Sequence, residues 1–250
     1  MRIFAIVLMF FWAAGAQAFE SYAKYNVKYS WFELGDAIAK LSIDGDRYVT
    51  EVSAKSKKMA ATFSGNRQET YRSEGRVIKE NGQNVLLPEK LEWRMKSTNK
   101  SRYIIWIFDH ENEIATMVKE ECDSKKKCNH ETTMLEGEKY SRNDILTIYH
   151  NITNNFMKSP EKNIEVNVVG SRKRARVEKP EGKLLKAAQE NLGLTSGNIL
   201  VVHLNQELFS SADGALFVLL DDDNIVKKAV IVDTVLFGDV VGDLVEKKVN

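Results

Sequence analysis

The chain contains four histidines and two cysteines, and their spacing limits the chemistry that the sequence supports. His110, His130, His150 and His203 form neither an H-x-H nor an H-x-x-x-H pair. A zinc site would need several such ligands at a recognisable spacing. The HExxH, GxSxG, phosphate-loop and dinucleotide motifs are also missing. We therefore expect no metal, no cofactor and no catalytic residues, and we predict that the protein is not an enzyme.

The histidines have a simpler interpretation than catalysis. His110 and His130 lie beside turns, where we expect solvated side chains. His150 lies in a helical segment next to Tyr149, and His203 lies in an apolar strand, where a histidine is usually buried with a hydrogen-bond partner. An uncharacterised enzyme stays as the third alternative, and it would need polar groups that converge in a cleft around His150 or His203.

The two cysteines predict a disulfide. Cys122 and Cys128 flank the polar loop DSKKK, and the segments on both sides alternate as strands do. In an oxidising compartment such a pair closes a hairpin. A metal site would instead need His130 and one more ligand. A bridge over so short a loop contributes on the order of 2 kcal/mol, so it pins the hairpin register more than it holds the fold.

A basic run, GSRKRARVEKP at 170–180, raises the possibility of anion binding. In a strand, Arg172, Arg174 and Arg176 share one face. We predict a solvated surface on which these arginines pair with acidic neighbours. In the alternative, the ladder contacts phosphate or carboxylate head groups. Nucleic acid is excluded as a partner, because the formal net charge is only +1 and because the chain carries an export signal.

That signal occupies residues 1–18. A cation at Arg2 precedes an apolar run from Ile3 to Ala14, and Ala16-Gln17-Ala18 has the small-x-small pattern of a cleavage site. No second apolar stretch approaches the length of a membrane span. We therefore predict a cleaved signal peptide, a periplasmic location and no transmembrane anchor in the mature chain.

The elements that must position these residues are mostly strands. Apolar and polar residues alternate over most of the mature chain, and Asp44-Gly45 is a strong hairpin signal. Residues 141–160 change to helical spacing, with Ser141 or Asn143 as the cap. Residues 181–193 carry a weaker helical pattern that ends at Gly193.

This pattern predicts a mainly β fold in which one strongly curved antiparallel sheet forms a half-barrel or open barrel. One long helix covers the sheet as a lid or plug, and a second short helix is expected. We assign residues 19–250 to a single domain, with residues 158–163 as the one candidate boundary within it.

Several segments resemble a known family when they are taken in order. These are YRSEGRVI, LLPEKLEW, IFDHENE, YSRNDILTIYHN and FVLLDDDNIVKKAVIVDTVLFGDVVGDL. Together they resemble the exported bacterial proteins of domain-of-unknown-function family 3108. The resemblance implies a periplasmic, strongly curved antiparallel sheet without assigned catalytic residues. Its motif positions in this chain are Ser73, Gly75, Leu87, Pro88, Asp144 and Tyr149.

We expect these motif residues to serve the fold. Gly75 interrupts a strand, as a bulge would, and Pro88 should begin a strand or lie at an edge. Asp144 lies at the start of the long helix, where a carboxylate binds free N–H groups. Tyr149 should face the sheet.

Two functions are compatible with these sequence features. In the first, the protein is non-catalytic and holds a lipid or a hydrophobic segment of an envelope partner on its concave sheet face. Aromatic residues at alternating strand positions motivate it: Tyr25, Tyr29, Trp31, Trp93, Trp106 and Phe108. In the second, the protein is a structural or assembly module that docks on other envelope components through its strands.

Overall fold

The structure is a computed structural model that describes residues 18–30, 32–170, 174–203, 215–234 and 238–250. The predicted signal peptide, apart from Ala18, and the residues Trp31 and Arg172 therefore lie outside the described part. Within the described part, no helix is long and apolar enough to cross a membrane.

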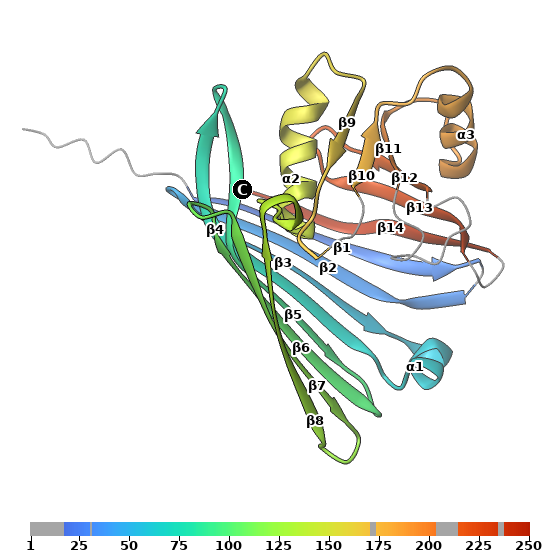
Figure 1. Ribbon diagram of the computed structural model, residues 1–250. Coiled ribbons are helices and arrows are strands. Elements are labelled where there is room, and N and C mark those ends of the chain that lie inside the picture. Colours follow the sequence, from blue (N-terminus) through green and yellow to red (C-terminus); the bar gives the residue numbers. More distant parts are fainter. Residues whose placement is uncertain (1–17, 31, 171–173, 204–214, 235–237) are drawn as a thin grey trace, which may run out of the picture.

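In the part of the chain that the structure describes, fourteen strands form one antiparallel sheet (Figure 1). The strands are β1 Phe19–Tyr29, β2 Phe32–Asp44, β3 Arg47–Ser56, β4 Gln68–Glu80, β5 Gln83–Lys96, β6 Lys100–Asp109, β7 Ile114–Asp123, β8 Cys128–Glu136, β9 Asn163–Val166, β10 Ala175–Glu178, β11 Asn198–His203, β12 Ala215–Leu220, β13 Val226–Thr234 and β14 Gly238–Val249. The helices are α1 Lys58–Ser64, α2 Ile145–Asn155 and α3 Gly182–Leu192, and the short 3-10 helices are η1 Gly137–Lys139 and η2 Phe156–Lys158.

The chain builds the sheet as a long meander that returns to its start. Strands β1 to β8 follow one another in sequence, and β14 to β9 continue the sheet on the other side of β1. Among the described strands, the one pairing between partners distant in sequence joins β1 to β14. Strands β8 and β9 are the two edges, and the described residues form no ladder between them. The predicted open, curved, mainly β fold is confirmed.

The long helix packs on both halves of the sheet, because Ile148 and Ile152 belong to a buried cluster with residues of β10, β11 and β12. Helix α2 contacts β3, β4 and β5 (Figure 1). Its N-cap is Asp144, whose side chain accepts hydrogen bonds from Leu146 N and Thr147 N. The prediction that Ser141 or Asn143 caps the helix was wrong. Ser141 instead donates to the carbonyls of Asn143 and Asn167, so its hydroxyl serves the preceding loop.

Helix α3 matches its prediction at the C-terminus. It ends at Leu192, and its C-cap is Gly193, which has a φ of 69° and donates to Gln189 O and Glu190 O. Helix α1 was not predicted from the sequence. Residues 158–163, the candidate boundary, connect η2 to β9, and β9 belongs to the same sheet as the strands before it.

Two glycines allow neighbouring strands to approach closely. At Gly75 the register between β4 and β5 shifts, as the predicted bulge requires. A Cβ at Gly75 would lie 2.1 Å from Leu87 O, and a Cβ at Gly35 would lie 2.1 Å from Lys55 O. Any side chain at these two positions would push the adjacent strand away, so glycine fixes the curvature there.

Pro88 lies in the interior of β5 and not at its start, but at a local edge of the sheet, which is one of the two predicted positions. The register explains why the ladder tolerates it. Strand β6 pairs with β5 only from Lys90 onward, so residues before Lys90 form a local edge. Asn151 of α2 covers part of this edge: its side chain accepts from Leu86 N at 2.8 Å and donates to Leu86 O at 3.0 Å.

Candidate functional site

The concave face of the sheet contains a cavity beneath α2. Its volume is about 510 Å³. It lies between the inner faces of β1, β2, β3, β13 and β14, helix α2 and the turn between β12 and β13. The register places Ala23 opposite Ala39 and Tyr25 opposite Ala37, so these side chains point to the same face. The cavity exists because small residues line this stripe and leave room under the helix.

Two neutral polar groups face this cavity from opposite walls. His150 Nε2 on α2 lies 3.2 Å from Thr50 Oγ1 on β3, and the Thr50 hydroxyl donates to Lys40 O at 3.0 Å. Because that hydroxyl proton is committed to Lys40 O, the consistent arrangement has His150 Nε2–H donating to Thr50. Burial lowers the pKa of His150 to about 4, so the imidazole is neutral near pH 7.

Tyr149 closes the cavity on another side. Its hydroxyl donates to Asn224 O at 3.0 Å. Burial raises the pKa of Tyr149 and of Tyr25 well above the usual range. Tyr149 therefore ties α2 to the turn between β12 and β13 and lines the cavity at the same time, in place of simply facing the sheet as predicted.

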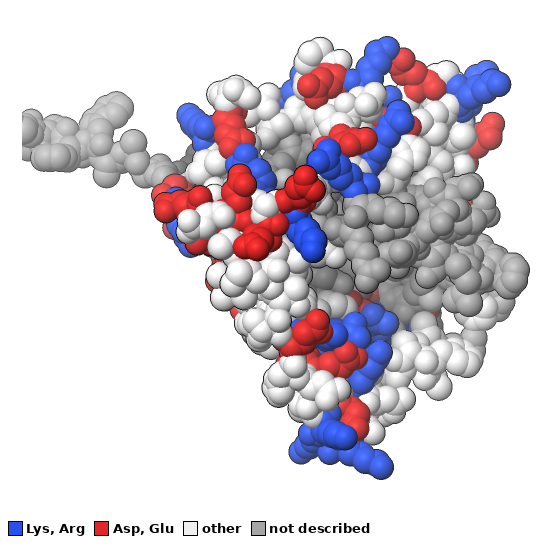
Figure 2. Space-filling view, viewed as in Figure 1, with Lys and Arg blue, Asp and Glu red and all other residues white. Residues whose placement is uncertain are grey.

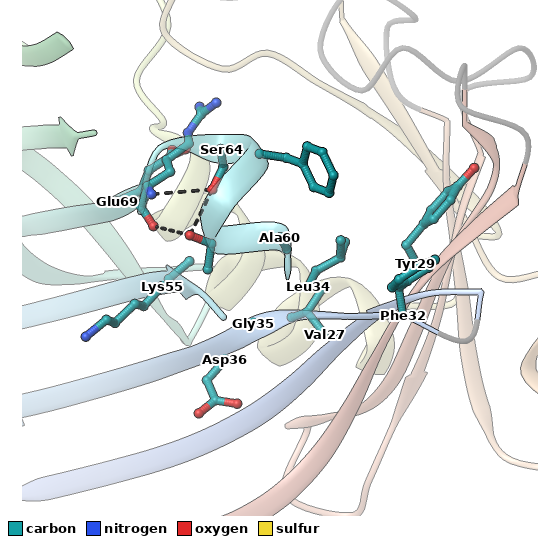
Figure 3. Close-up of a pocket in the computed structure, with 14 residues that line it drawn as sticks. Val27, Tyr29, Phe32, Leu34, Gly35, Asp36, Lys55, Ala60, Ser64 and Glu69 are labelled. Carbon is teal, nitrogen blue, oxygen red and sulfur yellow. Dashed lines mark hydrogen bonds and ion pairs between the residues drawn. The ribbon is translucent and has the colours of Figure 1, made fainter. Parts of the chain in front are cut away.

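A second, wider groove continues along the same face beside α1 (Figure 3). Its volume is about 730 Å³, and Val27 lines both this groove and the cavity under α2. Figure 3 shows Val27 and Leu34 between the sheet and α1, whereas Asp36 and Lys55 point to the opposite face. The wall facing α1 is therefore mostly apolar.

The neighbouring stretch of the concave face is filled. Trp106, Phe108 and Leu91 pack against Leu146 of α2 and against Val169. Beside them, Tyr71 stacks on Trp93 with ring centroids 5.5 Å apart. The aromatic residues expected on the concave face therefore divide into two groups: Tyr25 and Tyr29 line open space, whereas Trp106 and Phe108 are core residues.

The family-motif residues Ser73 and Asp144 meet in a buried chain of hydrogen bonds. Ser73 Oγ donates to Asp144 Oδ2 at 2.5 Å, and Tyr48 Oη lies 2.9 Å from Ser73 Oγ. All three side chains are buried. Burial raises the pKa of Asp144, and the hydrogen bonds from Ser73, Leu146 and Thr147 oppose that shift. None of the three lines the cavity or the groove, so the chain anchors α2 to β3 and β4.

The other predicted site residues are dispersed. Cys122 and Cys128 form the expected disulfide, which closes the hairpin of β7 and β8. The predicted arginine ladder is shorter than expected because β10 begins at Ala175, after Arg174. Arg174 lies 3.6 Å from Glu165, and Arg176 lies 2.7 Å from Glu178.

The histidines do not form a common site. His130 is exposed, as expected. His110 is not solvated as predicted, because its ring nitrogens contact Tyr140 Oη and Pro88 O. His203 lies 2.7 Å from Glu178 Oε1 at a half-exposed position. The described residues contain no group of three or more side chains that could hold a metal.

Comparisons with known proteins identify the architecture. No family model matches the chain, and no curated protein matches it, so the resemblance to family 3108 stays a prediction. Among solved structures, the chain is similar to the crystal structure of a beta-barrel-like protein of domain of unknown function DUF1849 from Brucella abortus. The identity is 9%, the TM-score is 0.50, and the match covers 92% of this chain and 98% of that chain. This similarity shows a shared barrel-like β fold.

Sequence reasoning missed the stripe that creates the cavity. Its signal was present, because Gly35, Ala37 and Ala39 alternate along β2 and share one face. The pairing of His150 with Thr50 had no such signal, since the two residues are 100 positions apart.

Proposed function

We propose that this protein is an exported, non-catalytic binding protein of the bacterial envelope that holds an acyl chain or a comparable apolar segment on its concave face. The observation that carries the proposal is the adjacent cavity and groove, which share Val27. Each has a volume in the range of about 300–1,000 Å³ that is typical of ligand sites.

The polarity of the lining supports an apolar ligand. The cavity interior offers the neutral groups of His150, Thr50 and Tyr149, and the charged side chain of Asp223 pairs with Lys247. A charged group placed in the cavity would lose its hydration without gaining a counter-ion there. An uncharged chain has no such hydration to lose, and its entry removes apolar surface from water.

Export and membership in family 3108 belong to the same proposal. They rest on the pattern of residues 1–18 and on the ordered motifs, and the disulfide of Cys122 and Cys128 is compatible with an oxidising compartment. The absence of catalysis is also proposed. Its support is that the most elaborate polar chain, Tyr48–Ser73–Asp144, is buried away from the cavity.

A test should fill the cavity without disturbing the sheet. Ala39→Phe places a large side chain in the stripe under α2, and Ser53→Phe places the same side chain on the opposite face of β3. We expect native mass spectrometry of the purified protein to show a bound lipid. We expect Ala39→Phe to abolish displacement of a fluorescent fatty-acid probe, while Ser53→Phe retains it. Equal probe binding by both variants would contradict the proposal.

The second candidate is a docking module for other envelope components. It is favoured by the free edges β8 and β9, which form no ladder with each other among the described residues. An unpaired edge can add a strand from a partner. Crosslinking in intact cells tests it, and two cysteine substitutions on β8 should capture the same protein reproducibly.

A further inference from the structure

The two ends of the β1–β8 half carry opposite charge. Because connections in a meander alternate between ends, the β3–β4, β5–β6 and β7–β8 connections share one end, which we name the α1 end. With the flanking strand ends included, residues 56–68, 96–100 and 123–128 contribute eight Lys and Arg there and one acidic residue, Asp123. At the opposite end, residues 44–47, 80–83, 109–113 and 136–139 contribute eight Asp and Glu and two Lys and Arg.

The formal net charge of the whole chain is only +1, so it does not reveal that basic and acidic residues lie at different ends. Figure 2 shows basic side chains gathered at the tip that the β7–β8 turn occupies in Figure 1, beside an acidic one, and acidic side chains interspersed with basic ones at the opposite end. Such a distribution orients a molecule in the field of a charged surface. The protein would approach an anionic surface with its α1 end first.

Most of the cations at the α1 end are available. Lys57 pairs with Asp36 and Glu33, and Arg67 pairs with Glu69. Five exposed lysines form no ion pair within the described part of the chain: Lys96, Lys100, Lys125, Lys126 and Lys127. Four strand steps separate β3 from β7, so these charges spread over roughly 19 Å.

The α1 end also carries an exposed aromatic residue. Phe63 on α1 is 87% exposed, more than any other large hydrophobic side chain described. It borders the 730 Å³ groove, together with Phe32 and Tyr29. A ring in this position gains free energy when it leaves water for the boundary between lipid head groups and acyl chains.

We infer that the α1 end docks on a bilayer surface that contains anionic phospholipids, with Phe63 inserted among the head groups and the groove mouth turned toward the lipid. The kind of cation favours a lipid surface over an acidic protein. All five free cations are lysines, which act as point charges, whereas specific recognition of a protein carboxylate usually employs the planar fork of arginine. This docking goes beyond the proposed ligand binding and does not depend on it.

The test is co-sedimentation of the full chain with vesicles. We expect binding to vesicles of phosphatidylglycerol and phosphatidylcholine to exceed binding to phosphatidylcholine alone by at least about tenfold at low salt, and 0.5 M salt to remove the difference. Phe63→Ser should weaken binding about tenfold. The double variant Lys125→Gln/Lys127→Gln should also weaken it about tenfold or more, since each lysine near an anionic surface contributes about fivefold.

Two control variants test whether vesicle binding depends on the total charge of the chain or on the cavity under α2. Lys79→Gln/Lys139→Gln makes the same charge change at the opposite end and should bind within about twofold of the natural chain. Ala39→Phe should bind vesicles normally even where it blocks the fatty-acid probe. The inference would be overturned if the two double lysine variants lost vesicle binding equally, or if the natural chain bound anionic and neutral vesicles alike. Capture of an acidic protein by a chain that ignores such vesicles would assign this end to a protein partner instead.

Discussion

The concave face shows two solutions to the same packing problem. Over β4 to β7, large side chains such as Trp106 and Phe108 fill the space under Leu146 of α2. Over β1 and β2, alanines leave the space under α2 open. There α2 is held by the hydrogen bonds of His150 with Thr50 and of Tyr149 with Asn224. Helix α2 is thus fixed on both sides of the open region, by Leu146 over β4 to β7 and by Ile148 and Ile152 against β10 to β12, which allows the space over β1 and β2 to stay open.

The largest effect should come from breaking the anchor of α2 in the filled region. Asp144→Ala removes the N-cap and leaves the buried Ser73 hydroxyl without its acceptor. We expect urea denaturation to show a loss of about 4 kcal/mol in the free energy of unfolding. Asp109→Ala, which removes an exposed turn carboxylate, should lose less than about 1 kcal/mol. A loss of that small size for Asp144→Ala would show that α2 is held in another way.

The open region predicts a pH dependence. Burial lowers the pKa of His150 to about 4, below the value of about 6.5 in the unfolded chain. The stabilisation by neutral His150 is therefore complete above about pH 6.5 and is lost as the pH falls toward 4. Relative to His150→Gln, the natural chain should lose on the order of 3 kcal/mol over this interval. His130→Gln, at an exposed site, should retain the natural profile.

A smaller difference in the free energy of unfolding should appear between glycine substitutions in the two regions. Gly75→Ala places a Cβ against Leu87 O, whereas Gly242→Ala meets nothing within 4 Å. We expect a loss of about 2 to 3 kcal/mol for the first and a change within about 0.5 kcal/mol for the second. Thermal unfolding of both variants measures the difference. Equal effects would show that the bulge at Gly75 can relax.

The smallest expected effect is on the hairpin at the α1 end. Replacing Cys122 and Cys128 with serine should lower the free energy of unfolding by about 2 kcal/mol, because the loop that the bridge closes is short. The fatty-acid probe should bind as before, since neither cysteine lines the cavity or the groove. Lost probe binding would mean that this hairpin supports the open region.

The sequence predicted the strands of the meander well, because alternation and turn signals such as Asp44-Gly45 are local. It also predicted α2, α3 and the disulfide from local spacing. It placed the cap of α2 at the wrong residue because Ser141, Asn143 and Asp144 lie within four positions and could each accept a bond. Only the fold decides which of them lies at the first turn.

The candidate site was less accessible to sequence reasoning. The cavity depends on which small residues of β1, β2 and β14 share a face after the pairing of β1 with β14, and these strands lie at opposite ends of the chain. The net charge gave no sign of the charge separation between the two ends. That separation can be recognised only when it is known which connections lie at the same end of the sheet. Helix α1 is only seven residues long, which is too short for a helical pattern of apolar residues to be recognised in the sequence.

The open edge between β8 and β9 has a mechanical consequence. In a closed barrel the radius is fixed by the number of strands and their stagger, so the bore cannot change without breaking a backbone ladder. Here no ladder joins the two edges within the described residues. The distance across the interior is set by side chains of α2, such as Tyr149, which bridges to Asn224. The width of the interior therefore depends on side-chain contacts made by α2 and not on a backbone ladder across this opening.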